Sequence, residues 1–241
     1  MTKIADIKKI FIPYRSTLEE KEIVGRYSKG TKQTFNFKKY QTIVHEWLPF
    51  TTQPATILDI GCGEGTVTNF LKKEFPNAKC VIGVDISEEM IDVAKQTYKG
   101  IDFRMGEMDK LPLGDGEADF IFSRLAIHYS QDLRKTLAEV ARVARPGALF
   151  FIKDAHPFFA TFLKESLDYN QKEDVIFHAQ CDDDIEVIHP TFTVEEYING
   201  FIATGWEIVS MHEPYGRGAT KNRSGAYKVP TSICFVLRRK Q

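Results

Sequence analysis

The sequence predicts an α/β protein with a mostly parallel sheet, and two segments carry this prediction. Residues 57–65 read Ile-Leu-Asp-Ile-Gly-Cys-Gly-Glu-Gly, an apolar run that ends in a glycine-rich turn. Residues 81–87 read Val-Ile-Gly-Val-Asp-Ile-Ser, a second apolar run that ends in a carboxylate. Apolar runs and helical patterns then alternate as far as residue 153, which favours parallel strands joined by right-handed crossovers. Ligands of such sheets bind at the carboxyl ends of the strands.

The first part of the chain alternates between amphipathic segments and short apolar runs. Helical spacing of apolar residues predicts helices in residues 18–27 and 36–47, ahead of the first strand. Buried strands are predicted at residues 55–60, 80–85, 101–105, 118–123 and 148–153. The predicted helices between them are one through Phe70 and Leu71, one with Ser87 as N-cap and Met90, Ile91 and Ala94 facing inward, and one over residues 133–143 that ends at the turn Arg145-Pro146-Gly147.

The pattern changes after residue 153. Residues 158–167 have helical character, and residues 174–180 and 185–189 are expected to form an antiparallel hairpin around Asp182-Asp183-Asp184. Thr193 is expected to cap a helix that runs to Ala203, because acidic residues occupy its first turn. Two closing strands are predicted at residues 206–211 and 232–237, separated by a long loop over residues 213–230.

Composition excludes several classes of function. The formal net charge of −1 gives no bulk attraction to nucleic acid or to anionic membranes, and the basic residues of the first forty positions are interpreted as a solvated helical face. The cysteines form no CxxC pair, so neither a zinc site nor a disulfide framework is expected; they are Cys62, Cys80, Cys181 and Cys234. We find no secretory h-region and no apolar run long enough to span a membrane, so a cytoplasmic location is expected.

The glycine turn and the carboxylate after it form a nucleotide-binding βαβ unit. Glycines let the main chain approach a ligand closely, and Asp85 at the tip of the second strand can accept hydrogen bonds from a ribose diol. The spacing is G-x-G-x-G, whereas the dinucleotide fingerprint is G-x-G-x-x-G, and Asp59 precedes the first glycine. The segment closely resembles motif I of the class I S-adenosylmethionine-dependent methyltransferases, in particular of the small-molecule subgroup.

This resemblance implies a Rossmann-like three-layer sandwich with a seven-stranded, mostly parallel sheet whose last strand is antiparallel. It also implies S-adenosylmethionine as cofactor and S-adenosylhomocysteine as product. Gly61 and Gly63 would contact the methionine portion of the cofactor, Asp59 would orient that portion, and Asp85 would bind the ribose. Two further residues next to these positions are predicted cofactor contacts by the same resemblance, namely Cys62 and Ile86.

Two later segments resemble further cofactor motifs of the family. Residues 106–113 resemble the Gly-Asp-Ala-x-x-Leu-Pro-Phe block, so Glu107 would take the adenine amino group and the backbone N–H of Met108 a ring nitrogen. Asp109 remains an alternative to Glu107 for the adenine. Residues 121–129 resemble the stretch after the fourth strand, in which Ser123 and Leu125 would line the methionine end, as would Arg124 between them.

Most of the candidate residues for binding or activating the methyl acceptor are histidines. His156 follows the fifth strand in a His-Pro pair like that of some small-molecule methyltransferases, and His189 lies in a later segment of similar type. A histidine can remove a proton from an acceptor hydroxyl, amine or thiol near neutral pH. His156 and His128 are therefore the candidate catalytic residues, with loop bracing and core packing as their respective alternatives. His189 and Tyr129 are candidates for substrate binding.

The sequence therefore predicts a single-domain methyltransferase that acts on a small-molecule acceptor. Residues 1–50 would form an N-terminal helical cap, and residues 154–190 would be an insertion over the acceptor pocket. A nucleic-acid substrate is not expected, because no Asn-Pro-Pro-Tyr/Phe segment follows the fourth strand. The alternatives are methylation of protein or tRNA, a non-catalytic protein that binds the cofactor, and a nicotinamide-dependent oxidoreductase.

Overall fold

A computed structural model describes residues 14–15, 22, 25–26, 29, 31, 35–50, 53–179, 182–214 and 230–241. Its main feature is a seven-stranded sheet in the order β4-β3-β2-β5-β6-β10-β9. The strands are β2 (Thr56–Ile60), β3 (Cys80–Asp85), β4 (Asp102–Met105), β5 (Ala118–Arg124), β6 (Ala144–Ala155), β9 (Trp206–His212) and β10 (Ser232–Arg239).

All pairings from β4 to β6 are parallel, whereas β10 is antiparallel to both β6 and β9. The predicted seven-stranded sheet with an antiparallel last strand is therefore confirmed. The chain moves outward from β2 through β3 to β4 and then returns to add β5 and β6 on the other side of β2. The crevice at the carboxyl ends of β2 and β5 is thus the topological switch point, where such sheets bind ligands.

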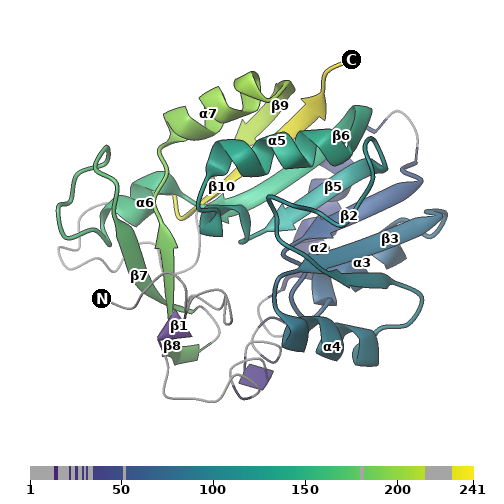
Figure 1. Ribbon diagram of the computed structural model, residues 1–241, viewed down its shortest axis with the longest axis horizontal. Helices are drawn as coiled ribbons and strands as arrows, with labels where there is room; N and C mark the ends of the chain where they lie inside the picture. Colours follow the sequence, from purple (N-terminus) through teal and green to yellow (C-terminus); the bar gives the residue numbers. More distant parts are fainter. Residues whose placement is uncertain are drawn as a thin grey trace.

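Helices cover both faces of the sheet (Figure 1). They are α2 (Phe37–Thr42) with the π-helical turn η2 (Ile43–Trp47), α3 (Thr66–Glu74), α4 (Glu88–Thr97), the 3₁₀ turn η3 (Ile127–Tyr129), α5 (Leu133–Val143), α6 (Pro157–Thr161) and α7 (Val194–Ala203). The apolar stripes of α2 and α3 pack on one face, and those of α5 and α7 pack on the other. The two large apolar clusters are therefore separated by the sheet, and a smaller cluster includes Ile91 and Ala94 of α4 with Phe103 of β4.

Two helix starts have the capping side chains that the sequence predicts. Ser87 accepts a hydrogen bond from the backbone N–H of Met90 at the start of α4. Thr193 and Glu196 form a reciprocal capping box at the start of α7. Each cap satisfies backbone donors that the first turn of a helix leaves unpaired.

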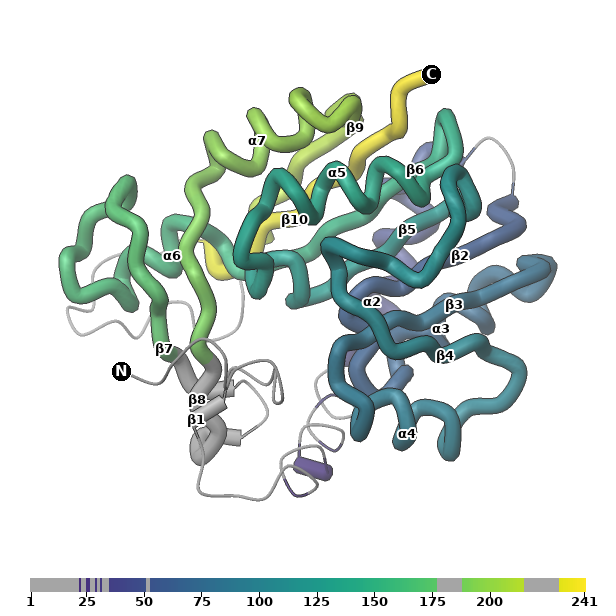
Figure 2. Tube along the Cα trace, viewed as in Figure 1, coloured from purple at the N-terminus to yellow at the C-terminus, as the bar shows by residue number. Residues whose placement is uncertain are grey.

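A second, three-stranded sheet has the order β1-β8-β7, with β1 (Tyr14–Arg15), β7 (Asp174–Ala179) and β8 (Asp182–Pro190). The antiparallel β7–β8 pair confirms the predicted hairpin. Figure 2 shows α6 and β7 at one side of the main sheet, well away from α4. Among the described residues, no helix combines the length and the apolar character needed to cross a membrane.

Three local predictions are wrong. The helix predicted for residues 158–167 starts at Pro157 and ends at Thr161, and Leu167 has a left-handed backbone with a φ of 53° that a helix excludes. Residues 145–147 do not form a separate turn. They belong to β6, which starts at Ala144, and lie where its pairing with β5 is irregular. The acidic residues 182–184 belong to β8, since Asp182 pairs with Ala179.

Two predicted segments cannot be compared in full. Most of the helix predicted for residues 18–27 lies outside the described residues. The same holds for residues 215–229 of the long loop between β9 and β10.

Candidate active site

The glycine turn after β2 adopts a backbone that only glycine takes easily. Gly61, Gly63 and Gly65 have positive φ angles of 70°, 53° and 86°. A Cβ on Gly61 would lie 2.3 Å from the Cβ of Ala126, whereas a Cβ on Gly63 would meet no atom within 4 Å. Gly61 is thus required by the packing of the loop itself. Gly63 lies beside open space, which is where a ligand can approach the main chain.

Asp85 holds this loop from the tip of β3. Its Oδ2 accepts a hydrogen bond from the N–H of Gly63 at 2.8 Å, and its Oδ1 accepts one from the N–H of Ser87 at 3.0 Å. Burial raises the pKa of the Asp85 carboxyl, and the backbone donors oppose that rise. A carboxylate has about four acceptor positions, and the backbone of Ile86 also bonds Asp85, so about one remains for a further donor.

Asp59 and Cys62 face the protein interior. The hydroxyl of Thr68 in α3 donates to Asp59 Oδ2 at 2.7 Å, and burial raises the pKa of Asp59 to about 7. Asp59 therefore connects β2 to α3. The Cys62 thiol lies 3.6 Å from the carbonyl oxygen of Gly63, and burial raises its pKa well above the ordinary value. This thiol stays protonated and is no nucleophile.

The two acidic residues of the segment after β4 differ in their contacts. Asp109 forms an ion pair with Lys135 at 2.8 Å. Glu107 is exposed, and its carboxylate forms no ion pair within the described part of the chain. Met108 packs partly against the apolar cluster below it, and Ile86 is half-buried. Of the two acids, Glu107 is the one whose carboxylate is available to a ligand.

The turn after β5 has an unusual backbone at Leu125. This residue has a φ of 55°, which is rare for a residue with a side chain, and its N–H donates to the carbonyl oxygen of Lys153 at 2.7 Å. Such backbone strain is concentrated at functional sites. The Ser123 hydroxyl donates to the carbonyl oxygen of Ile60 at 3.2 Å. The Ser123 side chain therefore connects β5 to β2.

His128 belongs to a buried hydrogen-bond network at the end of β6. Its Nδ1 bonds Oδ1 of Asp154, and the Tyr197 hydroxyl donates to the other carboxylate oxygen at 3.2 Å. The opposite ring nitrogen of His128, Nε2, is buried and has no hydrogen-bond partner among the described residues. When the Nδ1–H of a neutral imidazole donates to a carboxylate, Nε2 is left as an acceptor. The contact with Asp154 thus fixes the orientation of the His128 ring and leaves Nε2 on its far side.

His189 and Tyr129 lie next to His128. The His189 ring centroid is 4.5 Å from that of His128 and 5.9 Å from that of Tyr129. Burial, followed by the nearby His128, lowers the pKa of His189 to about 4, so this ring is neutral at neutral pH. His128, His189 and Tyr197 line a cavity of about 10 Å³, which is the size of one water molecule.

His156 belongs to a different network. Its Nδ1 accepts from the N–H of Phe158 at 3.1 Å, which caps α6, and its Nε2 lies 2.8 Å from Oε1 of Glu213. His156 is fully buried, and both of its ring nitrogens are engaged. The geometry at His156 thus favours loop bracing over proton abstraction.

Asp154 and Tyr197 are site residues to which the sequence argument assigned no role. Asp154 stands beside the predicted His156, but alternation along β6 turns it to the α7 face. Tyr197 has the spacing of a core position in α7, and burial raises its pKa well above the ordinary value. Asp154 could have been identified from its position at the carboxyl end of a predicted buried strand. Tyr197 carries no comparable signal.

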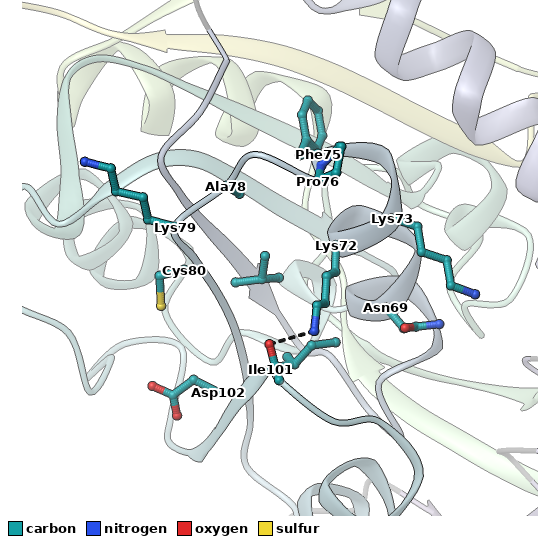
Figure 3. A pocket seen from close by; sticks show the side chains of 12 residues that line it. Asn69, Lys72, Lys73, Phe75, Pro76, Ala78, Lys79, Cys80, Ile101 and Asp102 are labelled. Atoms are coloured by element: carbon teal, nitrogen blue, oxygen red, sulfur yellow. Dashed lines mark hydrogen bonds between the residues drawn. The ribbon is translucent and has the colours of Figure 1, made fainter.

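A surface hollow lies at the other edge of the sheet. It measures about 600 Å³ and is lined by the last turn of α3 together with the starts of β3 and β4, including Lys72, Cys80 and Asp102 (Figure 3). The Lys72 ammonium donates to the carbonyl oxygens of Lys99 and Gly100 at 2.8 and 2.9 Å. These are the amino ends of the strands, so this hollow is on the opposite edge from Gly63.

Comparison with known proteins agrees with this geometry. The family model described as "Methyltransferase domain" matches residues 58–152. A malonyl-[acyl-carrier protein] O-methyltransferase of Yersinia pestis is 35% identical over 112 residues, which cover 46% of this chain and 38% of that protein. An uncharacterized methyltransferase of Schizosaccharomyces pombe is 27% identical over 170 residues, covering 66% of this chain and 59% of the other. The chain therefore spans only part of the length of these relatives.

Solved structures share the fold. An S-adenosylmethionine-dependent methyltransferase from Mesorhizobium loti superimposes with a TM-score of 0.63 at 22% identity, over 85% of this chain and 100% of the other. One from Clostridium acetobutylicum does so with a TM-score of 0.63 at 17% identity, over 91% and 98%. Residues 58–152 match the methyltransferase domain model, and the fold is shared with solved S-adenosylmethionine-dependent methyltransferases, both of which agree with the resemblance inferred from the sequence.

Proposed function

We propose that this protein transfers the methyl group of S-adenosylmethionine to a small-molecule acceptor. The observation that carries the proposal is the hydrogen bond of 2.8 Å between the Gly63 N–H and Asp85, beside open space above Gly63. Gly63 has no Cβ, so a ligand can approach its main chain, and the Asp85 carboxylate can accept a further hydrogen bond. Together they suit a nucleoside whose tail lies along the loop.

Each part of the cofactor has a fitting group in this chain. Asp85 would accept the ribose hydroxyls, Glu107 and the N–H of Met108 would bind the adenine, and Ile86 would pack against the nucleoside. The loop at Gly63 and the backbone at Leu125 would contact the methionine portion. The cofactor supplies a methyl group on a sulfonium, so the protein has mainly to position the acceptor and exclude water.

His128 is the candidate general base. Asp154 fixes the tautomer and orientation of its ring, and the unpartnered Nε2 could accept a proton from an acceptor hydroxyl, amine or thiol. His189 and Tyr129 would contact the acceptor. We propose that residues 1–50 and 154–190 cover the pocket, because the second segment contributes His189 and Pro157 to the cavity beside His128.

A small-molecule acceptor is favoured over nucleic acid by the residues at the end of β5, where Ser123-Arg124-Leu125 stands in place of the Asn-Pro-Pro-Tyr/Phe segment. Several relatives are named malonyl-[acyl-carrier protein] O-methyltransferases. Appearance of labelled methyl groups in a protein or tRNA fraction, with none in metabolites, would instead favour the macromolecular alternative.

Titration calorimetry with S-adenosylhomocysteine tests the proposal. Asp85→Ala removes the ribose acceptor and should weaken binding about ten- to a hundredfold, a loss of about 1–3 kcal/mol. Asp85→Asn keeps an oxygen for the Gly63 N–H and should still bind more weakly than the wild type. Asp92→Ala, which removes the same charge from the exposed face of α4, is the control and should bind normally. Unchanged affinity in a folded Asp85→Ala protein would remove the basis of the proposal.

A further inference from the structure

Two cations lie side by side at the carboxyl edge of the sheet. Arg124 ends β5, and Lys153 is its register partner near the end of β6. Phe122 and Phe151, two residues earlier on each strand, belong to the apolar layer under α2 and α3. Side chains two residues apart in a strand share a face, so Arg124 and Lys153 both point to the α2 side.

The guanidinium of Arg124 is held by aromatic side chains. Its Nε donates to the Tyr40 hydroxyl at 2.9 Å, and its Cζ lies 5.7 and 5.9 Å from the ring centroids of Phe35 and Tyr40. These contacts fix the orientation of the guanidinium. Its two terminal nitrogens form no hydrogen bond to a described residue, so the part of the fork that binds anions is left available.

Lys153 has no counter-ion among the described residues. It is half-buried and forms no ion pair there; burial, followed by the charge of Arg124, lowers its pKa to about 8. Its register partner on β10, Cys234, is a buried thiol whose pKa burial raises to about 11, so it supplies no counter-charge.

The acidic groups nearby are already engaged. Burial raises the pKa of Asp59, and the charge of Arg124 opposes this rise, but Asp59 already bonds Thr68. Asp154 neighbours Lys153 in sequence, yet it bonds His128 and Tyr197 on the opposite face of the sheet. Taking cations out of water without a counter-ion is unfavourable, and a bound anion relieves that cost.

We infer that Arg124 and Lys153 form a subsite for an anionic group of the methyl acceptor, a carboxylate or a phosphate. This inference rests on the proposed function and adds the charge of the acceptor to it. The carboxylate of the cofactor's methionine portion is the other source of such a group. That portion also carries an ammonium, which repels the same cations, so a zwitterion neutralises the cluster poorly.

Malonate is a suitable probe, because malonamide is a neutral molecule of nearly the same shape. Each is titrated at constant ionic strength into protein saturated with S-adenosylhomocysteine, and binding is followed by thermal shift and calorimetry. We expect saturable binding of malonate and none of malonamide. Lys153→Met and Arg124→Gln should each weaken malonate binding about tenfold or more. Lys79→Met removes an equal charge at the opposite edge of the sheet and should leave it unchanged.

Equal binding of malonate and malonamide, or no loss in Lys153→Met and Arg124→Gln, would overturn the inference. Competition between malonate and S-adenosylhomocysteine in the wild type would also overturn it, by assigning the cations to the cofactor. The malonate titration is repeated without S-adenosylhomocysteine. A protein that binds malonate at these cations but not S-adenosylhomocysteine would contradict the proposed function while leaving the anion subsite intact.

Discussion

Gly61 and Gly63 share a left-handed backbone but differ in what surrounds them. Alanine at either position is strained by about 1–2 kcal/mol. Gly61→Ala also drives a Cβ to 2.3 Å from that of Ala126, so overpacking of about 1–3 kcal/mol is added. We therefore predict that urea unfolding finds Gly61→Ala clearly less stable than Gly63→Ala. Gly63→Ala should instead lose affinity for S-adenosylhomocysteine, because its Cβ enters the open space. Equal stability of the two variants would contradict this account.

His128 and His156, both buried, form a second matched pair. His128→Asn removes the unpartnered ring nitrogen, so we predict that methyl transfer falls about 10²–10⁴-fold while affinity for S-adenosylhomocysteine is retained. His156→Asn replaces one helix-capping side chain by another and should keep most of the turnover. Turnover is measured as S-adenosylhomocysteine formed with the best acceptor from a panel of hydroxyl, amine, thiol and carboxylate metabolites. The reverse ranking of the two variants would make His156 the base.

At the scale of elements, the buried contact between Asp59 and Thr68 connects β2 to α3 and makes stability depend on pH. Burial raises the pKa of Asp59 from 3.8 to about 7, so the folded protein binds this proton more tightly than the unfolded chain does. Its contribution to stability is complete below about pH 4 and is lost as the pH rises through about 7. The difference is about 4 kcal/mol, as an order of magnitude.

Asp59→Asn keeps an oxygen acceptor for Thr68 but cannot ionise. We predict that between pH 4 and pH 7 the free energy of unfolding of the wild type decreases relative to that of this variant. Urea unfolding at several pH values measures this difference, in which all other titrating groups cancel. Parallel pH profiles of the two proteins would show that Asp59 does not carry this dependence.

The strands and helices of the main sheet could be predicted because local signals agree with the fold there. The strand at residues 80–85 and the helix at residues 133–143 have their predicted bounds, since an apolar run or an amphipathic stripe is decisive in each. The segment at residues 158–167 was predicted wrongly because its apolar spacing suits a helix. Lys164 instead donates to the carbonyl oxygens of Asp168, Tyr169 and Gln171 and so organises a loop, which no local pattern indicates.

The candidate site was predictable only where its residues lie in a motif. Asp85 follows a strand at a fixed spacing from the glycine turn, so its contact with Gly63 could be expected. The engagement of His156 depends on Glu213, which is 57 residues away, and that of His128 depends on Asp154 and on Tyr197 in α7. Such contacts arise from the packing of distant elements and leave no trace in sequence spacing.

At the scale of the whole molecule, one edge of the sheet gathers most of the chemistry. The carboxyl ends of β2, β3, β5 and β6 bring the glycine loop, Asp85, the Arg124–Lys153 pair and the His128–Asp154 pair to the same side. The amino-end hollow at Lys72 contributes none of these groups. The formal net charge of −1 does not reveal this arrangement, because Asp59 and Asp154 bond Thr68, His128 and Tyr197 and form no ion pair with Arg124 or Lys153.

The central claim is that this edge binds S-adenosylmethionine and not a dinucleotide. A thermal-shift measurement with S-adenosylmethionine, S-adenosylhomocysteine, NAD and NADP under identical conditions tests it most directly. A ligand at about a hundred times its Kd stabilises the folded state by about 2.7 kcal/mol, which raises Tm by about 5–10 °C for a chain of this size. We predict such a rise with S-adenosylmethionine and S-adenosylhomocysteine, and no comparable rise with either dinucleotide. Stabilisation by NAD or NADP alone would contradict the account and identify a nicotinamide-dependent oxidoreductase.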